Sequence, residues 1–424
     1  MVVFKISDDK IWEAIKNDIL RQSTTINLIA SENYASEEVI KTVGTVLMNK
    51  YSEGYPKKRY YGGNQFIDVC EQLAIDRANK LFGSEHANVQ PNAGSPANMA
   101  AFFALTDWLR KGKKIMGMKI DQGGHLTHGS PVNFSGILFD IVPYGVDKET
   151  HLIDMDDVRR IAEREKPNIL LAGATSYPRE IDFEEFGEIA KDVGASFMTD
   201  ISHIAGLIVA GVHKDAVKYS DVVMTTTHKT LRGPRGAILL CKNKYAEAVD
   251  KAVFPGMQGG PLDNIIAAKA VCFGEAMKPE FKEYGKKIVK NAKTLAETLI
   301  NGGMRIITNG TDNHLILADV TPLGLTGKEV EIFLDGVGIT VNKNVIPYDT
   351  RTPWNPSGIR IGTAALTTRG MGKTEMKLIG EWMITALKNH NNQDVLEEIK
   401  GDVKELCLHF PVYKNLMREY NDIK

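Results

Sequence analysis

From about residue 85 to residue 240, short apolar runs alternate with segments that have the apolar spacing of helices. Met155–Glu165 and Phe183–Val193 are two of the helical segments. This alternation predicts a mostly parallel α/β sheet with helices on both faces, whose buried strands are continuously apolar, as in the run NILLAGA. The predicted strands are Ala87–Gln90, Lys114–Met118, Leu138–Val142, Ile169–Ala172, Ser196–Asp200, Val222–Thr226 and Ile238–Cys241.

The sequence changes character after about residue 262. A long helical region, broken near Pro279, extends to about Leu299, and shorter strands and helices follow it. This order predicts a smaller α+β domain. We expect an N-terminal arm over residues 1–25, a large domain over residues 26–278 and a small domain over residues 279–424. The predicted elements of the small domain are strands near His314–Val320 and Ile339–Val341 and helices near Lys328–Leu334 and Thr374–Leu387.

The composition excludes several classes of protein. The chain has 424 residues, 43% hydrophobic and 25% charged, which excludes a mainly disordered protein. Its 52 basic and 53 acidic side chains leave a net charge of −1, so no obligatory nucleic-acid partner is expected. No apolar run reaches the roughly 18 residues of a membrane span, so no membrane partner is expected. The distant cysteines, and first residues without the apolar core of a secretory signal, favour a cytoplasmic protein.

The strongest local signal is TTTHKTLRGPRG at residues 225–236, which continues a predicted strand. A lysine at the end of a buried strand is unfavourable unless its charge is paired or used. A desolvated lysine loses its proton readily, which suits a Schiff base with a carbonyl compound. Taken alone, Lys229 is more often a surface lysine in a loop. The flanking Thr226, Thr227, His228 and Arg235 favour a site.

Asp200 ends another predicted strand, in SFMTDISHIAGLIVAG, and His203 follows it. A carboxylate at the carboxyl end of a strand lies where open α/β sheets bind ligands. An aspartate that faces a pyridinium nitrogen is what a pyridoxal phosphate enzyme requires. Taken alone, Asp200 serves equally well as a cap for the next helix. The pair of Asp200 and Lys229 favours the cofactor.

Two glycine-rich segments add to this hypothesis. In NVQPNAGSPANMAAFFAL, Ser95 is expected as the N-cap and Pro96 as the first residue of a helix whose free N–H groups bind a phosphate. An ordinary capped helix is the alternative. In DQGGHLTHGS, His125 and His128 have a spacing that zinc sites use, but no third ligand pattern is nearby. We therefore expect no metal, and a histidine that stacks on an aromatic cofactor.

Arg360 interrupts the apolar run SGIRIG. A buried arginine requires an anion, and its planar guanidinium suits a carboxylate, either of a substrate or of a structural ion pair. Nearer the N-terminus, LIASENYAS and NKYSEGYPKKRYYGGNQ offer hydroxyls and one carboxylate for proton transfer, unless the tyrosines form a core cluster. These side chains are Ser31, Tyr51, Glu53, Tyr60 and Tyr61. Residue chemistry alone thus predicts a pyridoxal phosphate enzyme that acts on a small amino acid.

As a set, the motifs closely resemble those of the serine hydroxymethyltransferase family, from about Leu28 to the segment VKELCLHFPVY. The resemblance implies fold type I of the pyridoxal phosphate enzymes. It implies conversion of serine and tetrahydrofolate to glycine and methylenetetrahydrofolate, with a folate-independent aldolase side activity on 3-hydroxy amino acids. The motifs that carry it are LIASEN, EGYP, KRYYGG, GGHLTHGSPVNFSG, TTTHKTLRGPRG, VFPGMQGGPL, GTDNHL, LTGKE, ITVNKN and SGIRIGT.

The resemblance also implies a role for each matching residue. Lys229 would form the Schiff base, Asp200 would pair with the pyridine nitrogen and His125 would stack on the ring. Catalysis is assigned to Lys229, Glu53, His228, Tyr61 and Thr226. Cofactor binding is assigned to Lys229, Gly94, Ser95, His125, Thr175, Asp200, His203, Tyr51, Gly259 and Gly260. Substrate binding is assigned to Ser31, Arg360, Tyr61 and His203, and folate binding to Glu53, Gly124, Leu126 and Asn344.

Tyr51, Gly259 and Gly260 would reach the phosphate of a neighbouring subunit, which implies a homodimer with active sites at its interface. The sequence departs from the family pattern at Ala93, where a serine is common, so one phosphate-binding hydroxyl is absent. Three alternatives remain open at this point. They are a pyridoxal phosphate aldolase that uses no folate, an aminotransferase on the same fold, and a non-catalytic RNA-binding or interaction protein.

Overall fold

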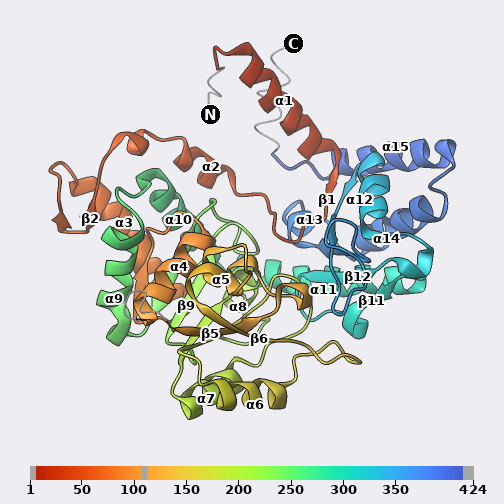
Figure 1. The fold of residues 1–424 in the computed structure, drawn as a ribbon. Helices are drawn as coiled ribbons and strands as arrows, with labels where there is room; N and C mark the ends of the chain where they lie inside the picture. Colours follow the sequence, from red (N-terminus) through yellow and green to blue (C-terminus); the bar gives the residue numbers. More distant parts are fainter. Residues whose placement is uncertain (1–5, 107–111, 414–424) are drawn as a thin grey trace.

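The computed structural model describes residues 6–106 and 112–413, and its largest sheet has seven strands (Figure 1). Neighbouring strands are parallel except at β10, which is antiparallel to both of its neighbours. The predicted mostly parallel α/β sheet is therefore confirmed. The order across the sheet is β4 (His86–Asn88), β10 (Ala237–Cys241), β9 (Val222–Thr226), β8 (Ser196–Asp200), β7 (Ile169–Gly173), β5 (Lys114–Met118) and β6 (Asp140–Tyr144).

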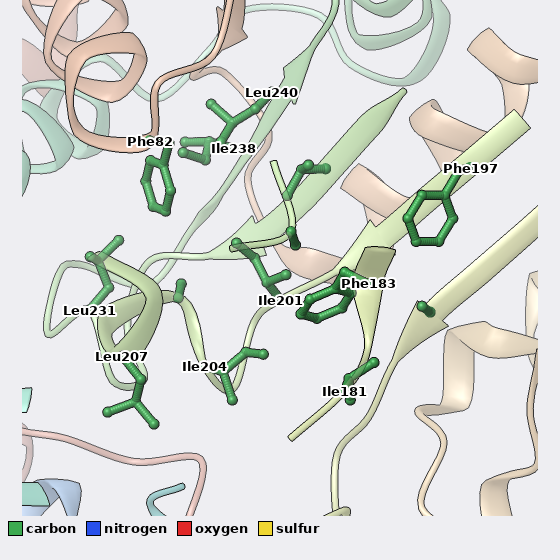
Figure 2. Close-up of a cluster of buried hydrophobic side chains, with 14 of the residues drawn as sticks. Phe82, Ile181, Phe183, Phe197, Ile201, Ile204, Leu207, Leu231, Ile238 and Leu240 are labelled. Carbon is green, nitrogen blue, oxygen red and sulfur yellow. The ribbon is translucent and has the colours of Figure 1, made fainter. Parts of the chain in front are cut away.

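Alternate residues along the buried strands enter different cores, because successive side chains of a strand point to opposite faces. Phe197 and Val223 pack with helices α6 (Met155–Glu165) and α7 (Phe183–Val193), in the core that Figure 2 draws in part. Their neighbours in sequence pack on the other face with α4 (Gly94–Leu105). This second set includes Ile115, Leu171, Met198, Met224 and Leu239. Both faces are apolar, which explains the continuous apolar runs.

Two predicted strands, Leu138–Val142 and Ala87–Gln90, are wrong by two residues at an end, and a side chain explains each error. Leu138 ends the short helix α5 (Phe134–Leu138) instead of starting β6, because the Asn133 side chain caps that helix by accepting from the Ser135 N–H. Strand β4 ends at Asn88, two residues early, because the Asn88 side chain accepts from the Gln90 N–H at 3.1 Å. The chain from residue 89 to residue 93 therefore leaves the sheet before α4 begins.

A second, antiparallel sheet organises the C-terminal part of the chain. Its strands, in order, are β11 (Arg305–Ile306), β12 (Leu315–Asp319), β15 (Gly358–Gly362) and β14 (Asn342–Asn344). Near the N-terminus, β1 (Ile26–Asn27) pairs in parallel with β13 (Ile339–Thr340), and Ile26 and Leu28 are buried in the core of this sheet. Helix α11 (Pro279–Asn301) contributes to both cores, so the division at residue 279 stays a prediction.

Helices cover both sheets, and α1 extends away from them in Figure 1. Helix α15 follows the last helix that the sequence predicted. Within the described ranges, no helix is long and apolar enough to cross a membrane. The remaining elements are α1 (Asp9–Thr24), α2 (Glu37–Val43), β2 (Gly54–Tyr55), β3 (Lys58–Arg59), α3 (Gln65–Phe82), α8 (Ala205–Val209), α9 (Ala246–Lys251), α10 (Asp263–Ala276), α12 (Gly327–Gly336), α13 (Ala364–Thr368), α14 (Lys373–Lys388) and α15 (Gln393–His409).

Candidate active site

A cavity of about 540 Å³ lies at the carboxyl ends of β8 and β9 and the N-terminus of α4. Ligands of open α/β sheets bind at this edge, because the loops that follow parallel strands converge there. The small domain contributes one wall through Arg360 on β15. Of the residues that the sequence assigned to the site, the cavity is lined by Ser31, Gly94, Ser95, His125, Leu126, Thr175, Asp200, His203, Thr226, His228, Lys229 and Arg360.

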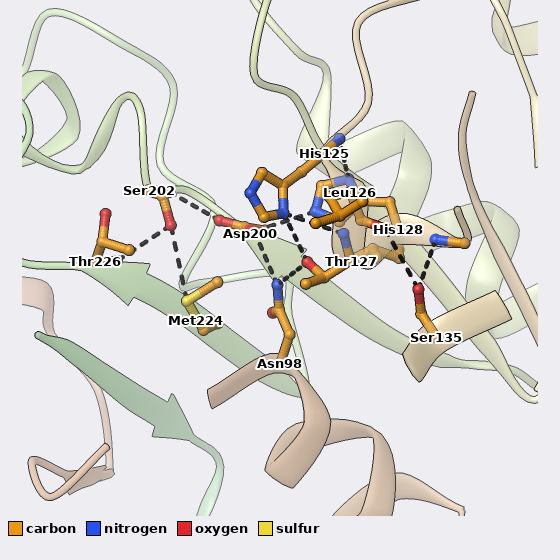
Figure 3. A network of polar contacts seen from close by, with 12 residues as sticks. Asn98, His125, Leu126, Thr127, His128, Ser135, Asp200, Ser202, Met224 and Thr226 are labelled. Carbon is orange, nitrogen blue, oxygen red and sulfur yellow. Dashed lines mark hydrogen bonds and ion pairs between the residues drawn. The ribbon is translucent and has the colours of Figure 1, made fainter. Parts of the chain in front are cut away.

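Asp200 is buried at the end of β8 and is the centre of a hydrogen-bond network (Figure 3). Its Oδ2 lies 3.1 Å from His128 Nε2 and accepts from Asn98 Nδ2 at 3.1 Å, while Oδ1 accepts from the Ser202 N–H at 3.0 Å. Burial by itself would raise the pKa of Asp200, but the hydrogen bond and charge of His128 outweigh burial and hold it well below its usual range. Asp200 is therefore a fixed carboxylate anion inside the cavity.

His125 faces the same cavity as a neutral ring. Its Nδ1 accepts from the Thr127 N–H at 3.1 Å, and burial lowers its pKa to about 4. Asn98 connects this histidine to Asp200, since its Nδ2 also donates to Thr127 Oγ1 at 2.7 Å. The ligand atoms of His125, His128 and Asp200 lie within 4.8 Å of one another, a spacing that a metal ion can use. The hydrogen bonds within the network account for this closeness without an ion.

Lys229 and Arg360 are two buried cations that line the cavity. Among the described residues, no side chain hydrogen-bonds or ion-pairs with Lys229 Nζ, and burial lowers its pKa to about 8. Arg360 donates through Nη1 to the Thr175 carbonyl at 2.9 Å and through Nε to Asn342 Oδ1 at 3.2 Å. Within the described part of the chain no carboxylate pairs with Arg360, so the structural ion pair left open by the sequence is not found there.

Helix α4 supplies hydrogen-bond donors at the third side of the cavity. The prediction that Ser95 is its N-cap is wrong, because Ala93 is the extended cap residue and the helix starts at Gly94. Pro96 is accordingly the third helical residue rather than the first. The first bond of the helix runs from the Ala97 N–H to the Ala93 carbonyl at 3.1 Å, so the N–H groups of Gly94 and Ser95 remain available.

Thr226 lies beside this helix start, and neither its buried Oγ1 nor the buried Nδ1 of His228 in the same cavity has a hydrogen-bond partner among the described residues. A Cβ atom at Gly94 would lie 2.8 Å from Thr226 Cγ2, so only glycine leaves this corner open. Buried polar groups without partners are unfavourable, which makes the corner a suitable place for a polar ligand.

A family model described as serine hydroxymethyltransferase matches residues 4–383, most of the chain. The chain belongs to the serine hydroxymethyltransferase family. It is therefore a fold type I pyridoxal phosphate enzyme that interconverts serine and glycine with tetrahydrofolate as co-substrate. The cavity fits this family cofactor, because it offers a carboxylate for a pyridinium, helix N–H groups for a phosphate and a lysine amine that no described side chain binds.

Three side chains that the sequence did not assign, Asn98, His314 and Asn342, bond to residues that line the cavity. His203 Nδ1 lies 3.2 Å from His314 Nε2, and burial lowers the pKa of both, that of His314 to about 3. Asn98 could have been found as the one polar residue one turn after Gly94 in an apolar helix. Asn342 and His314 lie in the motifs ITVNKN and GTDNHL, but only the pairing of β12, β14 and β15 brings them to the site.

A second group of assigned residues lies together outside this cavity. The Tyr51 and Tyr61 rings are in edge-on contact at 5.3 Å, and both side chains are about half exposed, at 54% and 49%. A Cβ atom at Gly260 would lie 3.0 Å from the Tyr51 ring, and one at Gly259 would lie 3.1 Å from Glu53 Oε1. We call Tyr51, Glu53, Tyr61, Gly259 and Gly260 the exposed cluster.

Arg59 fixes the backbone that carries the carboxylate of the exposed cluster. Its Nη1 donates to the carbonyls of Ser52 and Gly54, at 2.8 and 2.9 Å, on either side of Glu53. The two remaining assigned residues, Gly124 and Asn344, do not line the Lys229 cavity. A Cβ atom at Gly124 would lie 2.0 Å from the Met118 carbonyl, so this glycine is required by the close approach of the backbone.

Proposed function

We propose that the Lys229 cavity is the active site and that its residues have the roles implied by the family. The observation that carries this proposal is the pair of buried cations, Lys229 and Arg360, that have no anionic partner among the described residues although Asp200 lies in the same cavity. Cations in such a place are stabilised by an anionic ligand. A phosphate-bearing cofactor and an amino-acid carboxylate supply two such anions.

Pyridoxal phosphate, when bound, supplies an aldehyde for the amine and an electron-withdrawing ring. Asp200 holds a proton on the ring nitrogen, because its pKa is low and His128 and Asn98 fix its position. His125 covers one face of the ring as a neutral imidazole. The Gly94 and Ser95 N–H groups bind the phosphate at the start of α4. Polar contacts to the remaining cofactor oxygens are assigned to Thr175 and His203, whereas Thr226 and His228 are assigned to catalysis.

Arg360 and Ser31 bind the carboxylate of serine or glycine. Because Thr175 and Asn342 already hold two nitrogen atoms of the guanidinium, Arg360 presents its remaining N–H groups in one fixed direction. A carboxylate held in this way would fix the rotation of the bound substrate. Lys229 would hold the cofactor through Nζ, and its lowered pKa suits an amine that also takes part in proton transfer.

The exposed cluster completes the active site of a second copy of the chain, which makes the enzyme a homodimer. Tyr51, Gly259 and Gly260 reach the phosphate bound by the partner subunit. Glu53 and Tyr61 transfer protons near the serine hydroxyl and the pterin bound in that subunit. Exposed apolar side chains support this interface. Phe66, Val69 and Leu73 form a stripe along α3, with Phe66 73% exposed.

Folate binding is assigned to Glu53, Gly124, Leu126 and Asn344, of which Leu126 lines the cavity and is partly exposed. The chemistry of Cα–Cβ cleavage lies deeper, around Lys229 and Arg360. We therefore expect cleavage of other 3-hydroxy amino acids without folate as a side reaction. A cytoplasmic location remains a prediction, supported by the four cysteines, which are free in the described structure.

A titration followed by absorbance tests the proposal. The purified enzyme is scanned, then glycine is added, then tetrahydrofolate. We expect a visible band of the bound cofactor and a strong new band at longer wavelength only when both ligands are present. A cofactor band that does not respond to tetrahydrofolate would contradict the folate assignment. A protein that shows no cofactor band after addition of pyridoxal phosphate would contradict the whole site.

A further inference from the structure

The chain that leads into α4, Val89–Asn92, is fixed by side chains rather than by the sheet. The ladder between β4 and β10 ends at the pair of Asn88 and Leu239. Beyond it, Gln258 accepts from the Asn92 N–H at 2.9 Å and donates to the Gln90 carbonyl at 3.1 Å. The Pro91 carbonyl accepts from the Ala237 N–H at 3.1 Å. This segment ends directly before the Gly94 and Ser95 donors.

Lys269 on α10 supplies the strongest of these contacts. Its side chain is 1% exposed, and its Nζ donates to the carbonyls of Val89 at 2.7 Å, Pro91 at 3.0 Å and Ala237 at 2.9 Å. All three ammonium donors are thereby used. Burial lowers the pKa of Lys269 to about 7, whereas the three carbonyls favour its charged form, whose hydrogen bonds are stronger than those between neutral groups. One side chain therefore binds both the exit of β4 and the start of β10.

Lys269 has no carboxylate partner within the described residues that would explain its burial as an ion pair. Glu71, the acidic group whose charge acts on Lys269, is already bound by Arg59 and accepts from Gln90 Nε2 at 2.7 Å. A lysine that only held β4 and β10 together would bond to carbonyls within the ladder between these two strands. The three carbonyls of Lys269 lie instead beyond its last pair, on the side of the cavity.

The contact of Lys269 with the start of β10 also leads to the cavity, through Gly236. Gly236, which precedes Ala237, lines the cavity and accepts from the Thr227 N–H at 3.0 Å through its carbonyl. A Cβ atom at Gly236 would lie 2.6 Å from Lys269 Cε, so the lysine stem packs directly against this wall. Lys269 thus connects the backbone beside Lys229 with the backbone that leads to Gly94.

We propose that Lys269 is a positioning residue for the cofactor phosphate. It holds the Val89–Asn92 segment so that the N–H groups of Gly94 and Ser95 point at one place in the cavity. It touches neither cofactor nor substrate. The proposal rests on the proposed assignment of the phosphate to Gly94 and Ser95, and it predicts a defect that is specific for the phosphate group.

The test compares pyridoxal phosphate with pyridoxal, which lacks the phosphate. Dissociation constants of both compounds are measured on the full-length, cofactor-free enzyme and on Lys269→Met, which keeps the length of the stem but removes all three donors. We expect the dissociation constant of pyridoxal phosphate to rise about tenfold to a hundredfold, and that of pyridoxal to stay within about twofold. Lys269→Gln, which keeps two donors, should show the same selectivity to a smaller extent and serves if Lys269→Met does not fold.

Asn291→Leu is the matched control, because Asn291 also donates from a buried side chain, to Thr367 Oγ1 at 2.9 Å and the Met371 carbonyl at 3.0 Å, but in the small domain. It should change neither dissociation constant selectively. Equal weakening of both compounds by Lys269→Met, or no change in either, would overturn the role of Lys269. A wild-type enzyme that binds pyridoxal as tightly as pyridoxal phosphate would instead overturn the phosphate assignment itself.

Discussion

The Lys229 cavity and the exposed cluster differ in how their polar groups are satisfied. In the cavity, Asp200 has its hydrogen-bond partners within the same chain, and burial shifts the pKa of Lys229 and His125. In the exposed cluster, the Tyr51 and Tyr61 rings contact each other and are about half exposed to solvent. Groups near solvent keep ordinary reactivity until another surface excludes the water. This difference is what the proposed homodimer predicts, in which each chain supplies the exposed cluster to the cavity of its partner.

The largest expected effect comes from removing the amine of Lys229 from the cavity. Lys229→Ala should leave the fold intact and reduce serine-dependent formation of methylenetetrahydrofolate about a thousandfold or more, because no other amine lines the cavity among the described residues. Turnover and thermal unfolding are measured on the same preparation. Wild-type-like turnover by this variant would remove Lys229 from the chemistry.

Glu53→Gln removes the carboxylate of the exposed cluster with almost no change in the shape of the side chain. We expect the rate of serine cleavage with tetrahydrofolate to fall about a hundredfold to a thousandfold, because a proton-transfer group is lost. The affinity for glycine, which needs no such transfer, should change little. Both quantities are obtained from steady-state kinetics and from a glycine titration followed by absorbance. An equal loss of cleavage and glycine binding would argue against a proton-transfer role.

Arg360→Ala sharpens the comparison, since it removes a cation from the cavity without touching Lys229. We expect mainly a rise in KM for serine of about tenfold to a hundredfold, because the lost charged hydrogen bonds amount to roughly a few kcal/mol at most. Arg360→Lys, which keeps the charge but not the planar guanidinium, is the control. Its KM for serine should lie between that of the wild type and that of Arg360→Ala. An unchanged KM in the alanine variant would place Arg360 outside the site.

The smallest effect is a shift in pH dependence. Burial lowers the pKa of Lys229 from the ordinary 10.5 to about 8, and only the neutral amine attacks an aldehyde. The neutral fraction grows as the pH rises through the pKa of the folded protein. The rate at which the cofactor-free enzyme attaches pyridoxal phosphate should therefore be half-maximal near pH 8 and level off above it. A rate that continues to rise to pH 10 in stopped-flow measurements would contradict a desolvated Lys229.

The grouping of Asp200 and Lys229 in one cavity could be predicted because its signals are local. Asp200 ends β8 and Lys229 follows the end of the neighbouring β9, and the carboxyl ends of parallel strands meet at one edge of a sheet. The supporting side chains could not be predicted in this way. His203 meets His314 across 111 positions of sequence, and the small domain brings Arg360 to Thr175 across 185. Such contacts depend on how the two sheets pack, for which no local pattern exists.

The wrong predictions of element boundaries also have a common physical cause, which is capping at the ends of helices and strands. Asn88 and Asn133 end or begin elements through their own side chains, and strand periodicity does not detect such caps. The start of α4 was misplaced because Ser95 and Pro96 favour an N-terminus, whereas Ala93 adopts the extended conformation of the cap. The roles of the exposed cluster came from the family resemblance alone, since its residues lie outside the cavity of their own chain.

The central claim, that each active site is shared between two chains, is tested most directly by mixing two damaged subunits. Lys229→Ala and Glu53→Gln chains are co-expressed with different tags, and the mixed dimer is purified by both tags. In a shared arrangement one of its two sites contains an intact Lys229 and an intact Glu53. The account predicts about half of the wild-type activity per dimer, far above either parent variant. A mixed dimer no more active than the Glu53→Gln enzyme would contradict the claim and place both residues in the site of a single chain.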